Sequence, residues 1–192
     1  MMTKRRMACR AAPLVLLVSG GLAQAQNVDI TFKANIVETT CTMKLTGGSG
    51  DGLNNTLQIG PGGKVGLDKL LAGDQSATAT FSLDVVECPS SLDSLKTTVN
   101  GSNSNIVPSA IKNGVAKADG GADYVGVTIA RSSDLDNPFK INSLNDNERL
   151  VWTASEIQAK KVNLTARLVE TDASRVTPGQ FRATATFAFT YE

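Results

Sequence analysis

The stretch ATATFAFTYE, residues 183–192, decides the fold of this chain. Its apolar side chains recur at every second position, which is typical of a strand with one buried and one exposed face. The inward-facing set is Ala183, Ala185, Phe187, Phe189 and Tyr191. The sequence ends with Glu192, directly after this pattern, whereas chain ends usually fray because ordering them buries little surface. A core strand in this position needs a neighbour to cover it.

The same period of two recurs along the rest of the chain. Further strands are predicted by alternating runs at residues 26–36, 56–59, 77–88, 124–130 and 161–170. Clusters of glycine, asparagine, aspartate and serine separate these runs and predict turns. Only residues 65–71 and 153–160 favour a turn or two of helix. The pattern predicts a single all-β domain, a β-sandwich with Greek-key connections.

The first 25 residues are typical of a secretory signal. A basic start precedes an apolar stretch of about a dozen residues, too short to span a membrane, and the small residues of Ala23-Gln24-Ala25 follow it. Four of the 19 basic residues leave with this signal, so 15 remain against 18 acidic residues, a net charge of −3. This balance argues against nucleic acid or an anionic membrane surface as a partner.

Two cysteines, Cys41 and Cys88, remain after export, because Cys9 lies within the signal. An even count in an oxidising compartment favours a disulfide between them. The chain has no histidine and no C-x-x-C pair, so neither a metal site nor a redox site is expected. The commonest general base is therefore absent, and no G-x-S-x-G motif is present. We expect no enzyme activity and no cofactor.

The run at residues 26–36 has two interpretations. It begins directly after the signal, and its apolar face is nearly uninterrupted up to Ile36. On the structural interpretation it is a long edge strand of its own domain. On the functional interpretation it is an arm for the sheet of another molecule, because strand addition works through backbone bonds and alternate side-chain pockets. The alternating pattern by itself leaves both open.

Several features together resemble one known family. The first cysteine, Cys41, lies sixteen residues into the mature chain, and FSLDVVEC closes a strand at Cys88. The run YVGVTIA at 124–130 and the ending TARLVETDASRVTPGQFRATATFAFTYE are also similar, with Gly179 fourteenth from the end and Tyr191 penultimate. In this order and spacing, the chain resembles the structural subunits of chaperone–usher pili, such as the rod and adaptor subunits of type 1 pili.

The resemblance implies an incomplete immunoglobulin-like β-sandwich of six strands plus an N-terminal donor arm, completed by a strand from another chain. Residues 1–25 would be the signal peptide, 26–36 the donor-strand arm and 37–192 the pilin domain. The donor side chains would be Val28, Ile30, Phe32, Ala34 and Ile36. The acceptor and chaperone-contacting strand would carry Gly179, Ala183, Ala185, Phe187, Phe189, Tyr191 and Glu192.

The implied function is that of a structural subunit which polymerises by donor-strand complementation and exchange into an adhesive pilus. The implied partners are neighbouring subunits, a periplasmic chaperone that anchors the carboxylate of Glu192, and an outer-membrane usher. The implied destination is the cell surface, reached through the periplasm. The missing neighbour of the last strand would then come from another molecule.

Two points depart from this picture or compete with it. The arm position usually held by glycine in the family is Ala34 in this chain, seven residues before Cys41. The competing function is a secreted single-domain adhesin or binding module with a self-contained sandwich, which would keep residues 26–36 as an internal strand. Trp152, the single tryptophan, is expected in the core and not on a sugar-binding platform.

Overall fold

The computed structural model describes residues 41–89 and 92–191. The expected signal peptide, the expected arm and Glu192 therefore lie outside the described residues. The chain divides into two units, Met1–Ile36 and Val37–Glu192, and all described residues belong to the second unit.

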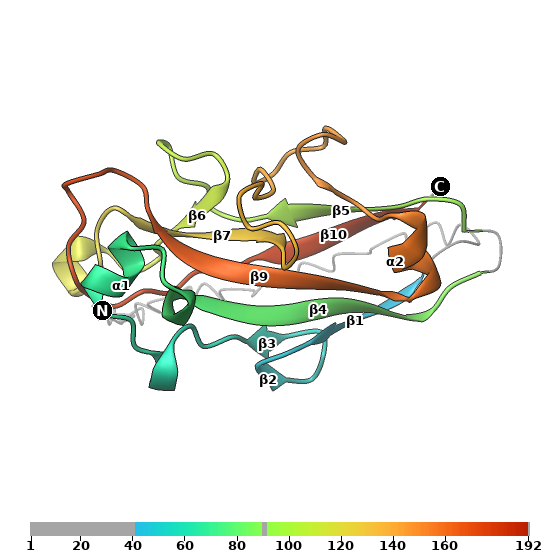
Figure 1. The fold of residues 1–192 in the computed structure, drawn as a ribbon, viewed down its shortest axis with the longest axis horizontal. Helices are drawn as coiled ribbons and strands as arrows, with labels where there is room; N and C mark the ends of the chain where they lie inside the picture. The colour runs from blue at the N-terminus through green and yellow to red at the C-terminus, as the bar shows by residue number, and fades with distance from the viewer. Residues whose placement is uncertain (1–40, 90–91, 192) are drawn as a thin grey trace, which may run out of the picture. The chain divides into compact units, whose positions relative to one another are not determined.

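The larger sheet has five antiparallel strands in the order β1-β4-β9-β7-β6 (Figure 1). Their bounds are β1 Thr42–Thr46, β4 Thr78–Glu87, β9 Lys161–Glu170, β7 Val125–Arg131 and β6 Ala110–Lys112. The two long strands β4 and β9 lie side by side, with Phe81 opposite Leu164 and Leu83 opposite Val162. Both pairs are buried, so the register places one apolar face of the sheet on the core.

The second sheet has three antiparallel strands in the order β10-β5-β8. Their bounds are β10 Thr186–Tyr191, β5 Leu95–Asn100 and β8 Leu150–Val151. A small hairpin pairs β2 Ser49–Gly50 with β3 Asn55–Thr56. The helical elements are α1 Leu67–Leu71, α2 Ala154–Gln158 and 3₁₀ turns at Pro61–Gly63, Gln75–Ala77 and Lys117–Asp119. A capping box of Thr153 and Glu156 begins α2.

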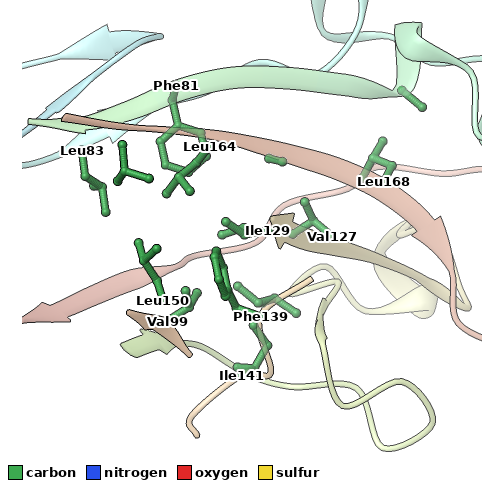
Figure 2. Close-up of a cluster of buried hydrophobic side chains, with 14 of the residues drawn as sticks. Phe81, Leu83, Val99, Val127, Ile129, Phe139, Ile141, Leu150, Leu164 and Leu168 are labelled. Atoms are coloured by element: carbon green, nitrogen blue, oxygen red, sulfur yellow. The ribbon is translucent and has the colours of Figure 1, made fainter. Parts of the chain in front are cut away.

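The core lies between the two sheets (Figure 2). Phe81 and Leu164 enter it from the larger sheet, and Val99 and Leu150 enter it from the smaller one. Leu95, Leu150 and Leu164 are fully buried. Trp152 is also buried, at 4% exposed, and its Nε1 donates to Thr97 Oγ1 at 2.9 Å. The expectation that Trp152 packs in the core is confirmed.

Most of the predicted strands and both predicted helices are confirmed in position. The runs at 77–88, 124–130 and 161–170 correspond to β4, β7 and β9, and α1 and α2 lie inside the two expected helical segments. The prediction of a strand over 56–59 is wrong, because pairing ends at Thr56. Leu57 and Ile59 follow the period of two because both side chains pack on the core. Their backbone, however, pairs with no strand among the described residues.

The strands of the described residues number ten, more than the six expected, because several are only two or three residues long. The strand predicted to begin at residue 183 pairs only from Thr186. Between residues 41–89 and 92–191, no helix is long and apolar enough to cross a membrane.

Candidate functional site

Strand β10 forms an edge of the three-stranded sheet, and its two faces differ sharply. Phe187, Phe189 and Tyr191 are half-buried and pack on the core, whereas the residues between them are exposed. The ring of Phe187 lies 5.7 Å from the ring of Phe81 on β4, which ties the two sheets together at this point. The alternation predicted from the sequence is therefore present here.

The same alternation continues upstream of β10. We call the half-buried apolar residues of this segment the acceptor row; its members are Phe181, Ala183, Ala185, Phe187, Phe189 and Tyr191. Core positions on the central strands are almost fully buried, so the partial exposure of the whole row marks it as a margin of the core. Apolar side chains at such a margin would be stabilised by a further covering element.

Hydrogen bonds on β5 show which way its backbone groups point. Trp152 N donates to Leu95 O, and Asn142 N donates to Val99 O, both at 2.9 Å. The backbone amides and carbonyls of the odd-numbered residues of β5 thus point away from β10. Successive residues of a strand direct their backbone groups to opposite edges, so the even-numbered residues of β5 bond to β10.

The pairing register then gives the direction of the β10 backbone. The partners of the even-numbered β5 residues are Thr186, Ala188 and Thr190. The amides and carbonyls of Phe187, Phe189 and Tyr191 consequently point to the other edge, where β10 has no strand partner within the described residues. These three residues therefore present both unpaired backbone groups and apolar side chains.

Strand β1 is one edge of the larger sheet, and a disulfide lies at its start. Cys41 and Cys88 are bonded, with their Cα atoms 4.3 Å apart, which confirms the expected pairing. The hydroxyl of Tyr191 donates to Cys41 O at 3.3 Å, so the end of β10 is linked to the start of β1. Burial raises the pKa of the Tyr191 phenol, which further favours the protonated form that donates this bond.

Asn113 anchors the chain just before β10. Its Nδ2 donates to Ala122 O at 2.9 Å and to Gln180 O at 2.7 Å, and its Oδ1 accepts from Arg182 N at 2.9 Å. The loop carrying Asn113 is thus bonded to the start of the acceptor row. Sequence reasoning did not identify Asn113, because an asparagine followed by glycine reads as an ordinary turn.

Gly179 lies in the same anchored segment, and the space around it excludes a side chain. A Cβ on Gly179 would lie 2.4 Å from Ala122 N and 2.5 Å from Gly121 C. The expected role of Gly179 in partner contact stays a prediction. What the structure adds is a close approach of two backbone segments that sets the direction of the chain into β10.

We predict that Gly179→Ala destabilises the domain by about 1–3 kcal/mol, because the added methyl meets backbone atoms that must move apart. The free energy of unfolding in urea measures this loss. Gly66→Ala is the matched control, since its Cβ would meet only the flexible side chains of Asp68 and Lys69. Equal stabilities of the two variants would contradict the prediction.

A polar cavity of about 460 Å³ is a second candidate site. Charged side chains from residues 131–139 and 146–151 line it. Asp146 forms an ion pair with Arg149 at 2.5 Å, and Arg131 forms one with Glu156 at 2.9 Å. Hydrogen bonds from Ser143, Lys140 and Asn145 lower the pKa of Glu148 to about 2. These groups are held in ion pairs of the fold itself, which are not a catalytic arrangement.

Within residues 41–89 and 92–191, no cluster of histidine, cysteine, aspartate and glutamate has the arrangement of a metal site. The acceptor row and its strand edge are therefore the candidate site, and the chemistry they offer is backbone pairing plus apolar burial.

Comparison with known families identifies the family of the chain. The model of the fimbrial protein family matches residues 30–192, most of the chain. This chain belongs to the fimbrial protein family. Over 173 residues this fimbrial protein is 34% identical to the uncharacterized fimbrial-like protein YadM of Escherichia coli strain K12, covering 88% of each chain. The resemblance stated from the sequence is confirmed at the level of the family.

Solved structures show the same fold. The crystal structure of the P pilus rod subunit PapA has a TM-score of 0.56 at 15% identity, covering 85% of this fimbrial protein and 99% of PapA. A chain from the structure of a chaperone–usher pilus has a TM-score of 0.48 at 16% identity, covering 89% and 98%, which is too weak to support an inference by itself. The fold is therefore mostly β and pilin-like.

Family membership gives the fimbrial protein a structural role as a subunit of a fimbria, and places it at the cell surface. The expectation that it is not an enzyme agrees with the non-catalytic character of this family.

Proposed function

We propose that this fimbrial subunit polymerises in the chaperone–usher manner, by strand donation between copies or between different subunits. Its domain, residues 37–192, is an incomplete immunoglobulin-like sandwich, and residues 26–36 form the donor arm. The observation that carries this proposal is the outer edge of β10, which has no strand partner among the described residues. There, Phe187, Phe189 and Tyr191 combine outward-pointing backbone groups with half-buried apolar side chains. A single extended strand with apolar residues at alternate positions complements such an edge.

The arm of a second copy has the chemistry that this edge requires. Val28, Ile30, Phe32 and Ile36 recur at alternate positions, as the acceptor row does. Full burial of each of these side chains would contribute roughly 1.5–3 kcal/mol. An added strand would also pair the free amides and carbonyls of β10, each a net gain of about 0.5–1.5 kcal/mol. Together these contributions would give a stable non-covalent joint.

The contact is heterologous, because the arm and the acceptor row are different surfaces of the chain. Heterologous contacts that do not close into a ring generate open filaments, which is what a fimbria requires. Before assembly, the exposed apolar edge would be prone to aggregation. A periplasmic chaperone that lends a strand and contacts the carboxylate of Glu192 would protect it until the outer-membrane usher exchanges that strand for an arm.

Deletion of residues 26–36 tests the proposal. We expect the truncated chain to fold with its chaperone, to accept an arm from a wild-type subunit, and to donate none. Native mass spectrometry of mixtures with wild-type chain would then show mixed dimers. In these dimers the wild-type chain would always donate its arm, and the truncated chain would always accept it. If the truncated chain unfolds although the chaperone is present, residues 26–36 are an internal strand, and the single-domain binding module becomes the better interpretation.

A further inference from the structure

We infer that the side-chain amides of Asn55 and Asn142 cap the competing strand edges of this domain and so confine strand addition to β10. The inference rests on the proposed function, and it names residues that decide where an incoming strand can pair. Both asparagines act on backbone groups of edge or near-edge strands, and neither belongs to the acceptor row.

The two main sheets of this domain have four edges, and each unprotected edge can pair with another chain. These edges are β10 and β8 in one sheet, and β1 and β6 in the other, while β2 and β3 form a separate small hairpin. The chain's own loop covers β6, since Ser104 N donates to Ala110 O at 2.7 Å and Lys112 N donates to Ser102 O at 2.8 Å. The remaining edges depend on side chains.

Asn142 continues the pairing of β5 beyond the end of β8. Strand β8 pairs β5 only at Lys96 and Thr97. The side chain of Asn142 then accepts from Gly101 N at 3.0 Å and donates to Gly101 O at 2.9 Å. This reciprocal pair imitates one rung of an antiparallel ladder. With Asn142 N bonded to Val99 O, the carbonyl of Val99 and both outward groups of Gly101 are occupied.

The backbone around Asn142 is built to hold this position. Asn142 has φ 61°, the left-handed region that asparagine tolerates better than most residues. Ile141 is buried beside it, and Lys140 bonds Glu148 twice, through its amide at 2.8 Å and its ammonium at 3.0 Å. The two residues before Asn142 are thus held by burial and by bonds to Glu148.

Asn55 performs the same task on β1. Its Nδ2 donates to Leu45 O at 3.2 Å and to Gly47 O at 2.8 Å, and its Oδ1 accepts from Gly52 N at 2.8 Å. Leu45 N donates to Gly52 O at 2.7 Å. The β2–β3 hairpin therefore occupies both outward groups of Leu45 on β1 and the carbonyl of Gly47 just after this strand.

The other positions on these edges also have partners. Tyr191 donates to Cys41 O at the start of β1, which leaves Met43 as the one outward-facing residue of β1 with no cap among the described residues. On β8, the guanidinium of Arg131 donates to Val151 O at 2.6 Å and is held in place by Glu156. Within residues 41–89 and 92–191, β10 is the edge of the two main sheets on which consecutive positions have no strand partner, so we expect an arriving strand to pair over several residues there.

The test uses the full mature chain purified with its chaperone, and a synthetic peptide of residues 26–36, QNVDITFKANI, as the donor probe. Native mass spectrometry counts the bound peptides, and hydrogen exchange locates them. We expect wild type to take one equivalent in exchange for the chaperone strand, with release of the chaperone and with amide protection kept at residues 186–191. Asn55→Ala and Asn142→Gly, singly and combined, should take a second equivalent, with new protection at residues 43–47 or 99–101 respectively.

Asn55→Asp and Asn142→Asp are the matched controls. Each loses the amide donor, as the test variants do, but keeps the acceptor and places a charge on the edge, which itself discourages pairing. The aspartate variants should therefore stay at one equivalent, whereas a general loss of stability would affect both sets alike. Asn142→Gly keeps the test usable if Asn55→Ala does not fold, because glycine adopts φ 61° freely.

The outcomes separate the two proposals. One equivalent in every variant, bound at β10, would overturn the capping role and leave strand addition standing. A second equivalent in the aspartate variants would overturn it as well. No peptide at β10 of the wild type would overturn the proposed function, and the inference with it.

Discussion

Phe32→Asp is expected to abolish filament formation by donation while leaving the acceptor edge intact. Phe32 is the largest apolar side chain of the proposed arm. Its removal forfeits roughly 1.5–3 kcal/mol of transfer free energy, and a buried unpaired carboxylate costs several kcal/mol more. At about 1.4 kcal/mol per tenfold change, the arm should lose at least a thousandfold in affinity. Electron microscopy of cells expressing only the variant should show no filaments of this subunit.

The same variant should still accept a wild-type arm, because the acceptor row lies in another part of the chain. Native mass spectrometry of the variant mixed with the QNVDITFKANI peptide should therefore show one bound equivalent, as for wild type. Phe32→Leu is the matched control, since it keeps an apolar side chain and should assemble. Normal filaments from Phe32→Asp would show that Phe32 does not face the acceptor edge.

Removal of the disulfide is expected to give the largest loss of folding stability. The bond between Cys41 and Cys88 closes a loop with a sequence separation of 47 residues. In the chain-entropy model, a loop of this size stabilises the folded state by about 4 kcal/mol. The double variant Cys41→Ser with Cys88→Ser should lose about this amount in urea unfolding, a large share of the 5–15 kcal/mol typical of a domain.

Wild-type chain with its disulfide reduced is the control for the serine substitutions, and it should unfold at the same urea concentration as the double variant. A thiol count on the oxidised wild type should find no free thiol in the mature chain. Two free thiols, or a double variant as stable as wild type, would contradict the expected contribution.

Alternation predicted those strands in which large apolar residues recur at every second position, including β7, which is buried on both faces. Strands β4 and β9 were recognisable because Phe81, Leu83, Val162 and Leu164 recur at every second position on the core face. Strand β5 was not recognised, because the sheet buries Thr98 on one side as well as Leu95, Thr97 and Val99 on the other. Strands such as β8, with two residues, are too short for any period to be seen.

The candidate site, too, was predictable from the sequence only in part. The acceptor row was predictable, since its periodicity is local and one side of the row must pack on the core. The asparagines were not, because their role depends on backbone groups far away in the sequence. Asn142 bonds Gly101 across 41 residues, and Asn113 bonds Arg182 across 69. In the sequence both look like ordinary loop residues, and only the folded arrangement shows which carbonyls and amides they reach.

The position of the disulfide has a mechanical consequence. In a filament assembled as proposed, tension would enter each domain from its own arm through the first residues of β1, and leave through β10. Cys41 lies at that point of entry and is bonded to Cys88, which directly follows the C-terminal end of β4. A pull on the arm would therefore be transmitted covalently to a ten-residue strand at the next position in the sheet. The load would therefore not separate β1 from β4. The contact that fails first under load would be the donated strand itself, which would slide lengthwise along β10.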